Sequence, residues 1–169
     1  TTPSTPQPSD LLENYTPGAW GSKIFAPYID MAGYPVPDLK AMMASADVPI
    51  KDMHFNAGFL TSTPSGEASW GGYETLNISN NSGQAGKIKA SLAEAQLAGA
   101  EVSISLGGQR GTYLAGYYQQ NGKSSQELAD TYGDVIDTFK VNRLDFDIEE
   151  SGSLTNNAEI NLRNEAITL

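Results

Sequence analysis

The stretch NRLDFDIEE, residues Asn142–Glu150, is the most informative part of the chain because its acidic and apolar side chains alternate. Every second position is acidic: Asp145, Asp147 and Glu149. The positions between them are apolar: Leu144, Phe146 and Ile148. Such alternation is typical of a β-strand and puts the three acids on one face. Crowded carboxylates resist burial, so this face is expected to meet a polar cavity; a solvent-facing edge strand is the alternative.

Strand-like and helix-like stretches alternate four times along the rest of the chain. Three strands are predicted at residues 23–29, 52–61 and 101–106, and a fourth begins at residue 143 and carries the acids. Helices are predicted at residues 36–46, 86–98, from 124 onward, and 157–169. The third helix has the clearest start, because Ser124 and Glu127 form a capping-box pattern. This order implies an α/β fold with a parallel sheet and crossover helices.

The acid stretch resembles the end of DxxDxDxE, the signature of glycoside hydrolase family eighteen, the chitinase family. Upstream, Ser105–Gly108 reads SLGG and resembles the second motif of that family, SxGG. FAPYIDM at residues 25–31 and the triplet Trp70-Gly71-Gly72 are similar to a bacterial and archaeal branch of chitinases. The resemblance covers nearly the whole chain from about residue 25. Asn142 and Arg143 stand where the family has Asp and Gly.

The family fold implies a domain larger than this chain. That fold is a parallel (β/α)8 TIM barrel, which typically needs about 250 residues, whereas the chain has 169. We therefore expect residues 21–169 to supply about the first four βα units, with the C-terminal half of the barrel in the same protein or in a second chain. Residues 1–20 begin TTPSTPQPS and are expected to be a Thr/Pro-rich linker and lead-in.

The resemblance implies catalytic roles for the three acids. Glu149 would be the general acid that protonates the glycosidic oxygen, Asp147 would hold the N–H of the substrate acetamido group, and Asp145 would share a proton with Asp147. The nucleophile would be the carbonyl oxygen of that acetamido group rather than a protein carboxylate. The implied reaction is hydrolysis of β-1,4-N-acetylglucosamine linkages in chitin or chito-oligosaccharides with retention, and the isolated fragment is expected to be inactive.

Four further residues are candidates for substrate binding: Tyr28, Trp70, Gly107 and Gly108. Tyr28 falls near the end of the first predicted strand. Trp70 stands beside two glycines and could either stack on a sugar ring or anchor its own loop. Gly107 and Gly108 permit close approach of a ligand or of backbone, or form a simple tight turn. His54 is the only histidine and is more typical of a hydrogen-bonded core residue than of a metal ligand.

Composition narrows the classes of partner. The net charge of −10 argues against nucleic acid, which attracts clusters of Lys and Arg. The chain has no cysteine, so disulfides and thiolate metal sites are excluded, and we expect no cofactor. No apolar run approaches the roughly 20 residues of a membrane helix, so no membrane partner is expected. The resemblance implies chitin or N-acetylglucosamine oligosaccharide as the partner and a location outside a bacterial or archaeal cell.

Two other functions remain open at this point. One is a carbohydrate-binding barrel without catalysis, since the family contains such proteins; loss of the acid Glu is their usual mark, and Glu149 is present. The other is a divalent-metal enzyme in which the acids of DxDxE serve as oxygen ligands, a reading that leaves SxGG unexplained.

Overall fold

A computed structural model describes residues 8–169, so most of the Thr/Pro-rich stretch predicted as a linker lies outside the described residues. Its helices and strands, with short 3-10 turns labelled η, follow in this order: η1 (Pro8–Leu12), β1 (Tyr28–Asp30), α1 (Leu39–Ser45), η2 (Ile50–Asp52), β2 (His54–Ser62), β3 (Ala68–Trp70), η3 (Glu74–Leu76), α2 (Gly83–Leu97), β4 (Glu101–Gly107), α3 (Leu114–Gln120), α4 (Ser125–Phe139), β5 (Leu144–Asp147), α5 (Ser151–Thr155) and α6 (Asn157–Thr168).

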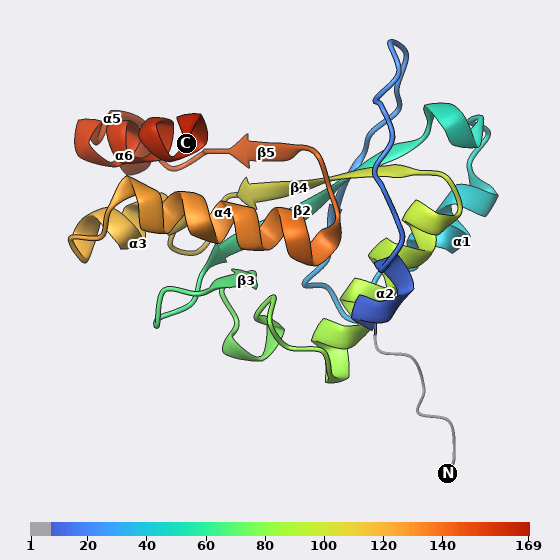
Figure 1. Ribbon diagram of the computed structural model, residues 1–169, viewed down its shortest axis with the longest axis horizontal. Helices are drawn as coiled ribbons and strands as arrows, with labels where there is room; N and C mark the ends of the chain where they lie inside the picture. The colour runs from blue at the N-terminus through green and yellow to red at the C-terminus, as the bar shows by residue number, and fades with distance from the viewer. Residues whose placement is uncertain (1–7) are drawn as a thin grey trace.

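The sheet is built from four parallel strands in the order β1-β2-β4-β5, as the alternation of strands and helices predicts. Their carboxyl ends point the same way, and α2 and α4 cover one face of the sheet (Figure 1). The short strand β3 pairs antiparallel with the end of β2. Within the described residues the sheet stays open, with β1 and β5 as the outer strands of the parallel set. This is a parallel α/β arrangement in which barrel closure is not observed.

Local sequence signals explain where the main helices begin and which face they bury. Helix α4 starts with the predicted capping box: the N–H of Glu127 donates to Ser124 Oγ at 3.2 Å, and the N–H of Ser124 donates to Glu127 Oε2 at 2.8 Å. Helix α2 buries Ile88 and Leu92 against the sheet.

Among residues 8–169, no helix has the length and apolar character that a membrane span requires.

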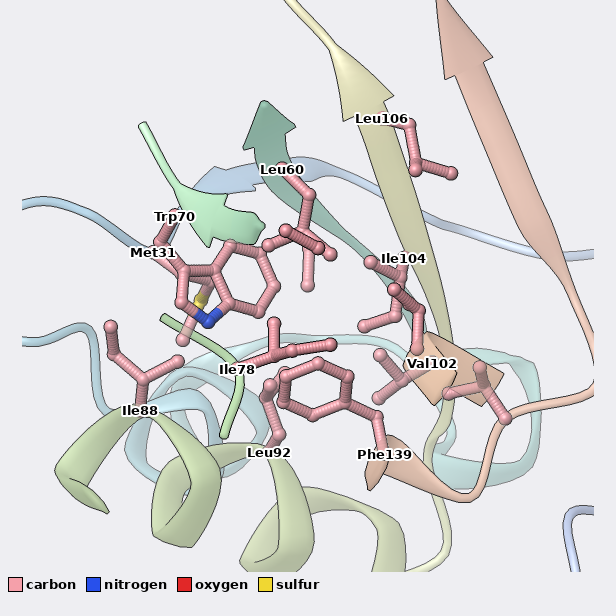
Figure 2. Packing of buried hydrophobic residues seen from close by; sticks show 14 of the residues in the cluster. Met31, Leu60, Trp70, Ile78, Ile88, Leu92, Val102, Ile104, Leu106 and Phe139 are labelled. Carbon is pink, nitrogen blue, oxygen red and sulfur yellow. The ribbon is translucent and has the colours of Figure 1, made fainter. Parts of the chain in front are cut away.

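The core lies between the sheet and the helices α2 and α4 (Figure 2). Strands contribute Leu60, Val102, Ile104 and Leu106. The helical layer contributes Ile88, Leu92 and Phe139. Each of these side chains is at most 4% exposed. In β4, Val102, Ile104 and Leu106 therefore face the core, and Ser103 and Ser105 between them face the other side of the sheet. The opposite, polar face of the same strand is thereby left for the candidate site.

Trp70 belongs to this core, which overturns the idea that it stacks on a sugar ring. Its side chain is 1% exposed, and its indole meets the ring of Phe139 edge to face with centroids 5.4 Å apart. Figure 2 shows it directed into the layer between the sheet and α2. Pairing of β3 with β2 turns Trp70 inward, and the region predicted as a polar loop, residues 62–82, therefore contains a strand. Trp70 thus packs in the shared core of the domain and does more than anchor its own loop.

The segment before β1 contacts helix α2 and the first residue of β4. Leu12 in η1 is 5% exposed, and η1 lies beside α2 (Figure 1). Further along, the N–H of Gly18 donates to Glu101 Oε1 at 2.8 Å. Leu12 and Gly18 thus contact the rest of the fold, and the predicted domain boundary at residue 21 stays a prediction.

The two positions that depart from the family motif hold this segment in place. Asn142 Nδ2 donates to the carbonyl oxygen of Gly18 at 2.9 Å. The Arg143 guanidinium lies 4.1 Å from the ring centroid of Trp20, within the range of a cation–π contact. Trp20 in turn lies 4.7 Å from the ring of His54. Asn142 and Arg143 thus have a structural role at the amino end of β5.

Replacing Asn142 with Asp should destabilise this protein, although Asp is the family residue. The carboxylate cannot donate to the Gly18 carbonyl and would place a negative charge beside it. We expect a loss of about 0.5–1.5 kcal/mol in the free energy of unfolding, the usual scale of one hydrogen bond. Urea unfolding followed by tryptophan fluorescence measures it, and an unchanged or raised midpoint would contradict the assigned role of Asn142.

Replacing Trp70 with Ala should cost about 3–5 kcal/mol of folding free energy, because it leaves a large cavity in a close-packed core. Tyr73, which is 61% exposed, is the matched control, and Tyr73→Ala should cost under about 1 kcal/mol. Calorimetric unfolding of both variants distinguishes the two positions. Similar losses would show that the burial of Trp70 has been misjudged.

Candidate active site

The pairing of β4 with β5 brings the two motifs side by side. Ser105 is the register partner of Asp145, and Gly107 is the partner of Asp147. Ser105 Oγ donates to Asp145 Oδ2 at 2.6 Å. The Tyr28 hydroxyl, at the start of β1, donates to the same oxygen at 3.1 Å. Asp145 is therefore fixed by donors from two other strands of the sheet.

The predicted alternation of acidic and apolar residues holds within β5. Phe146 faces the helices, where its ring meets that of Tyr132 in α4 edge to face with centroids 5.4 Å apart. Asp145 faces the opposite, polar side, where it contacts Ser105 and Tyr28. The same strand thus contributes to the core through one face and to the candidate site through the other.

Tyr28 is suited to be a permanent donor to Asp145. Partial burial raises the pKa of its hydroxyl, and the hydrogen bond to Asp145 and the negative charges of Asp145 and Asp147 raise this pKa further. The hydroxyl therefore keeps its proton at neutral pH. The ring remains 52% exposed and stacks on Phe59 at 6.0 Å between centroids. Tyr28 can thus hold the Asp145 carboxylate while presenting an aromatic surface.

Positions 107 and 108 require glycine, because neighbouring atoms occupy the space that a Cβ would need. A Cβ on Gly107 would lie 2.0 Å from the carbonyl oxygen of Asp147, and a Cβ on Gly108 would lie 2.8 Å from the Phe59 ring. Both residues have positive φ, 121° and 84°, which side chains disfavour. The N–H of Gly108 donates to the Asp147 carbonyl at 2.8 Å. These contacts favour the packing explanation, and substrate contact by the two glycines stays a prediction.

Glu149 and Glu150 lie beyond the end of β5, so the predicted strand extends two residues too far. Both side chains are exposed. Their backbone N–H groups donate to the Tyr113 hydroxyl at 3.0 and 3.1 Å. Glu150 is the N-cap residue of α5. The position of Glu149 is therefore set by a loop contact, unlike that of Asp145 and Asp147.

A cleft of about 400 Å³ opens beside the two glycines, at the carboxyl ends of β1, β2 and β4. Its lining includes Asp30, Phe59, Tyr73, Gly107, Gly108 and Arg110. A larger pocket of about 620 Å³ lies between η1, α2 and the end of α4, away from the acids. Parallel-sheet enzymes hold their ligands at the carboxyl ends of the strands, so the smaller cleft is the one that belongs to the candidate site.

Sequence reasoning missed several residues of this site. Ser105 lies inside the quoted SLGG motif, but its contact with Asp145 depends on strand register. Phe59 is placed by a register shift between residues 57 and 60 of β2, a bulge of the kind that redirects side chains. Arg110 and Tyr113 come shortly after the SLGG motif, in a stretch that has no periodicity or motif to mark them. None of these contacts leaves a local signal in the sequence.

His54 lies in the core at the amino end of β2, away from the acids. It is 2% exposed, burial lowers the pKa of its ring, and its Nδ1 accepts from the N–H of Glu101 at 3.3 Å. Among residues 8–169, no three His, Cys, Asp or Glu side chains converge as metal ligands would. The arrangement of the three acids therefore gives no support to the divalent-metal alternative.

The sequence is similar to two curated proteins that are named as chitinases. One is the probable bifunctional chitinase/lysozyme of Escherichia coli (strain K12), 33% identical over 151 residues, which are 88% of this chain and 15% of that protein. The other is endochitinase 11 of Metarhizium anisopliae, 33% identical over 131 residues, which are 78% of this chain and 22% of that protein. The chain thus spans less than a quarter of the length of either relative.

A solved structure shows the same fold. It comes from the crystal structures of catalytic site mutants of active domain 2 of chitinase from Pyrococcus furiosus, with a TM-score of 0.62 and 24% sequence identity. The match covers 89% of this chain and 45% of that one. No protein-family model matches the chain. The curated relatives, the shared fold and the paired motifs show that the chain belongs to the chitinase family, glycoside hydrolase family eighteen, of whose proteins it represents a part.

Proposed function

We propose that the protein hydrolyses β-1,4-N-acetylglucosamine linkages in chitin or chito-oligosaccharides, with retention of configuration. The observation that carries this proposal is the fixed carboxylate of Asp145, held by Ser105 at 2.6 Å and by Tyr28 at 3.1 Å. Asp147 ends β5 and Glu149 follows it two residues later, and the cleft is lined by Gly107, the register partner of Asp147. The names of the two curated relatives support chitin as the substrate class.

In this proposal each acid has one role. Glu149 donates its proton to the glycosidic oxygen as the bond to the anomeric carbon breaks. The acetamido carbonyl oxygen of the substrate forms the new bond to that carbon, which gives a cyclic oxazolinium ion. Asp147 accepts a hydrogen bond from the acetamido N–H and stabilises the positive charge. Glu149 then removes a proton from the water that opens the ring.

Asp145 tunes the charge of its neighbour. Its two donors both use Oδ2, which leaves Oδ1 for the proton that it would share with Asp147. Tyr28 and Ser105 hold the Asp145 carboxylate in place by hydrogen bonds, so the shared proton can pass from Asp147 to Asp145 as positive charge develops on the substrate.

The geometry of the strand supports a nucleophile supplied by the substrate. Asp145 and Asp147 lie on β5, where neighbouring residues of one face are about 6.6 Å apart, and Glu149 follows the end of that strand by two residues. All three acids therefore stand at the carboxyl end of one strand and would approach the substrate from one side. A nucleophilic carboxylate must instead lie across the scissile bond from the acid, which neither Asp147 nor Asp145 can readily do.

The proposed activity requires more than this chain. The open sheet leaves the outer edges of β1 and β5 for further strands, and we propose that the rest of a (β/α)8 barrel, in the same protein or in a second chain, completes it. The isolated 169-residue chain should then be inactive on chito-oligosaccharides. Activity of the isolated monomer would contradict the need for a complete barrel.

We also propose that the protein is secreted and is of bacterial or archaeal type.

In the protein with its complete barrel, Glu149→Gln should lower turnover by about 10²–10⁴-fold or more, the scale of general-acid loss. Substrate binding should remain, because Asp145, Asp147 and the cleft are unchanged. Initial rates on chito-oligosaccharides together with calorimetric titration of the same ligands test this directly.

Glu150→Gln is the matched control, since Glu150 is the adjacent exposed acid and stands at the N-cap position of α5, outside the acid pattern. It should change turnover by less than about threefold, as expected for a surface substitution. Equal losses in the two variants would mean that the roles of the adjacent acids have been misassigned.

Cleavage should require an acetyl group on the sugar whose anomeric carbon reacts. Matched oligosaccharides, one fully N-acetylated and one lacking that single acetyl group, should differ by at least about 10³-fold in rate, because the nucleophile is lost. A stable thiazoline analogue of the cyclic intermediate should inhibit. Proton NMR of the first product should show the β configuration. Equal rates or an inverted product would rule out a nucleophile supplied by the substrate.

A further inference from the structure

Tyr113 connects the two motifs through its hydroxyl group alone. The hydroxyl donates to the carbonyl oxygen of Gly108 at 2.7 Å. It accepts from the N–H of Glu149 at 3.0 Å and from the N–H of Glu150 at 3.1 Å. The residue is 5% exposed. The Tyr113 hydroxyl thus joins the glycine turn after β4 to the loop that carries the predicted general acid, 36 residues further along the chain.

We propose that Tyr113 is a positioning residue for catalysis, one that fixes the backbone of Glu149 relative to the Gly107–Gly108 turn. This rests on the proposed function, because it assigns Glu149 as the general acid. Tyr113 has no catalytic role of its own, since its hydroxyl is occupied by backbone groups.

The loop needs such a partner because sheet pairing ends before Glu149. The last β4–β5 register pair is Gly107 with Asp147, and the N–H of Gly108 donates to the Asp147 carbonyl at 2.8 Å. The backbone donors of Glu149 and Glu150, which lie past this last pair, have no strand beside them within the described residues. A hydroxyl group offers one donor and two acceptor positions, and the three hydrogen bonds of Tyr113 use all of them.

The ring of Tyr113 is itself firmly placed, so its hydroxyl is a fixed reference point. Tyr113 is the N-cap residue of α3. The preceding residue, Thr112, accepts a hydrogen bond from the N–H of Ser62 at 2.7 Å, which ties this loop to the end of β2. Leu106 and Phe146 lie with Tyr113 around a cavity of only about 10 Å³. Close packing of this kind leaves the ring little room to move.

Loss of the hydroxyl should therefore displace the acid without disturbing Asp145 or Asp147. Two N–H groups and one carbonyl would have to find water, and the loop would be free to shift. Proton transfer depends on heavy-atom distances of about 2.6–3.2 Å, so a shift of about 1 Å at Glu149 is enough to slow it. Substrate affinity should be largely kept, because the groups fixed by strand pairing stay in place.

The test uses Tyr113→Phe and Tyr118→Phe in the protein with its complete barrel. Tyr118 is the matched control: it lies on α3, is 6% exposed, and its hydroxyl shares a hydrogen bond with Thr131 Oγ1 at 2.7 Å. Each change removes one buried hydroxyl, but only the first touches the acid loop. The measurements are kcat and KM on a chito-oligosaccharide, and the exchange rates of the Glu149 and Glu150 amides by NMR.

For Tyr113→Phe we expect kcat to fall about 10- to 100-fold, KM to stay within about twofold, and both amides to exchange at least about tenfold faster. For Tyr118→Phe, kcat and both exchange rates should stay within about twofold of the unaltered protein. Unchanged exchange or unchanged kcat in Tyr113→Phe would overturn the proposal. An equal loss of kcat in Tyr118→Phe would also overturn it, because the effect would then belong to the fold as a whole.

Failure of the proposed function has a separate signature. If Glu149→Gln keeps full turnover, Glu149 is not the general acid, and Tyr113 cannot act on catalysis through it. If Glu149→Gln is inactive while Tyr113→Phe retains kcat and slow amide exchange, the proposed function stands and the positioning role of Tyr113 is wrong.

Discussion

The close approach of β4 to β5 at their carboxyl ends is the constraint on which the site depends. A side chain at Gly107 would begin 2.0 Å from the Asp147 carbonyl oxygen, so any other residue there would push the two strands apart. With glycine in place, the register continues from Ser105 opposite Asp145 to Gly107 opposite Asp147. The serine and the first glycine of SxGG thus serve the acids of DxDxE directly, and the two motifs form one structural unit.

Stability and chemistry share the same short strand but use different faces. Phe146 packs on Tyr132 of α4, while Asp145, one residue earlier, accepts hydrogen bonds from Ser105 and Tyr28. The helical layer therefore fixes the rotation of β5 about its own axis, and that rotation decides where the carboxylates point. A change of register by one residue would bury the acids and expose the aromatic ring. The packing of the core and the direction of the carboxylates therefore both depend on the rotation of β5 about its own axis.

Sequence periodicity was sufficient to predict the layers of the fold but not its details. The four parallel strands, the helices between them and the capping box at Ser124 all follow from local patterns. Strand β3 has only three residues and lies in a polar region, so it left no recognisable period, and the burial of Trp70 could not be foreseen. Asn142 bonds to Gly18 across 124 residues, and such a contact has no local signature. The acid pattern was visible, but the donors that hold Asp145 depend on register.

The three acids of the site are held by two different physical means. Asp145 and Asp147 are placed by hydrogen-bonded pairing between strands, which is cooperative and is supported by the whole sheet. Glu149 lies past the last pair, and its backbone N–H depends on one hydroxyl group, that of Tyr113. A related chain could therefore keep both motifs and hold the carboxylates of Asp145 and Asp147 as here, yet place Glu149 differently if it lacked an equivalent hydroxyl. Under the proposed function, sugar binding and proton donation would be separable in this architecture, because strand pairing supports Asp145 and Asp147 and a single side chain supports Glu149.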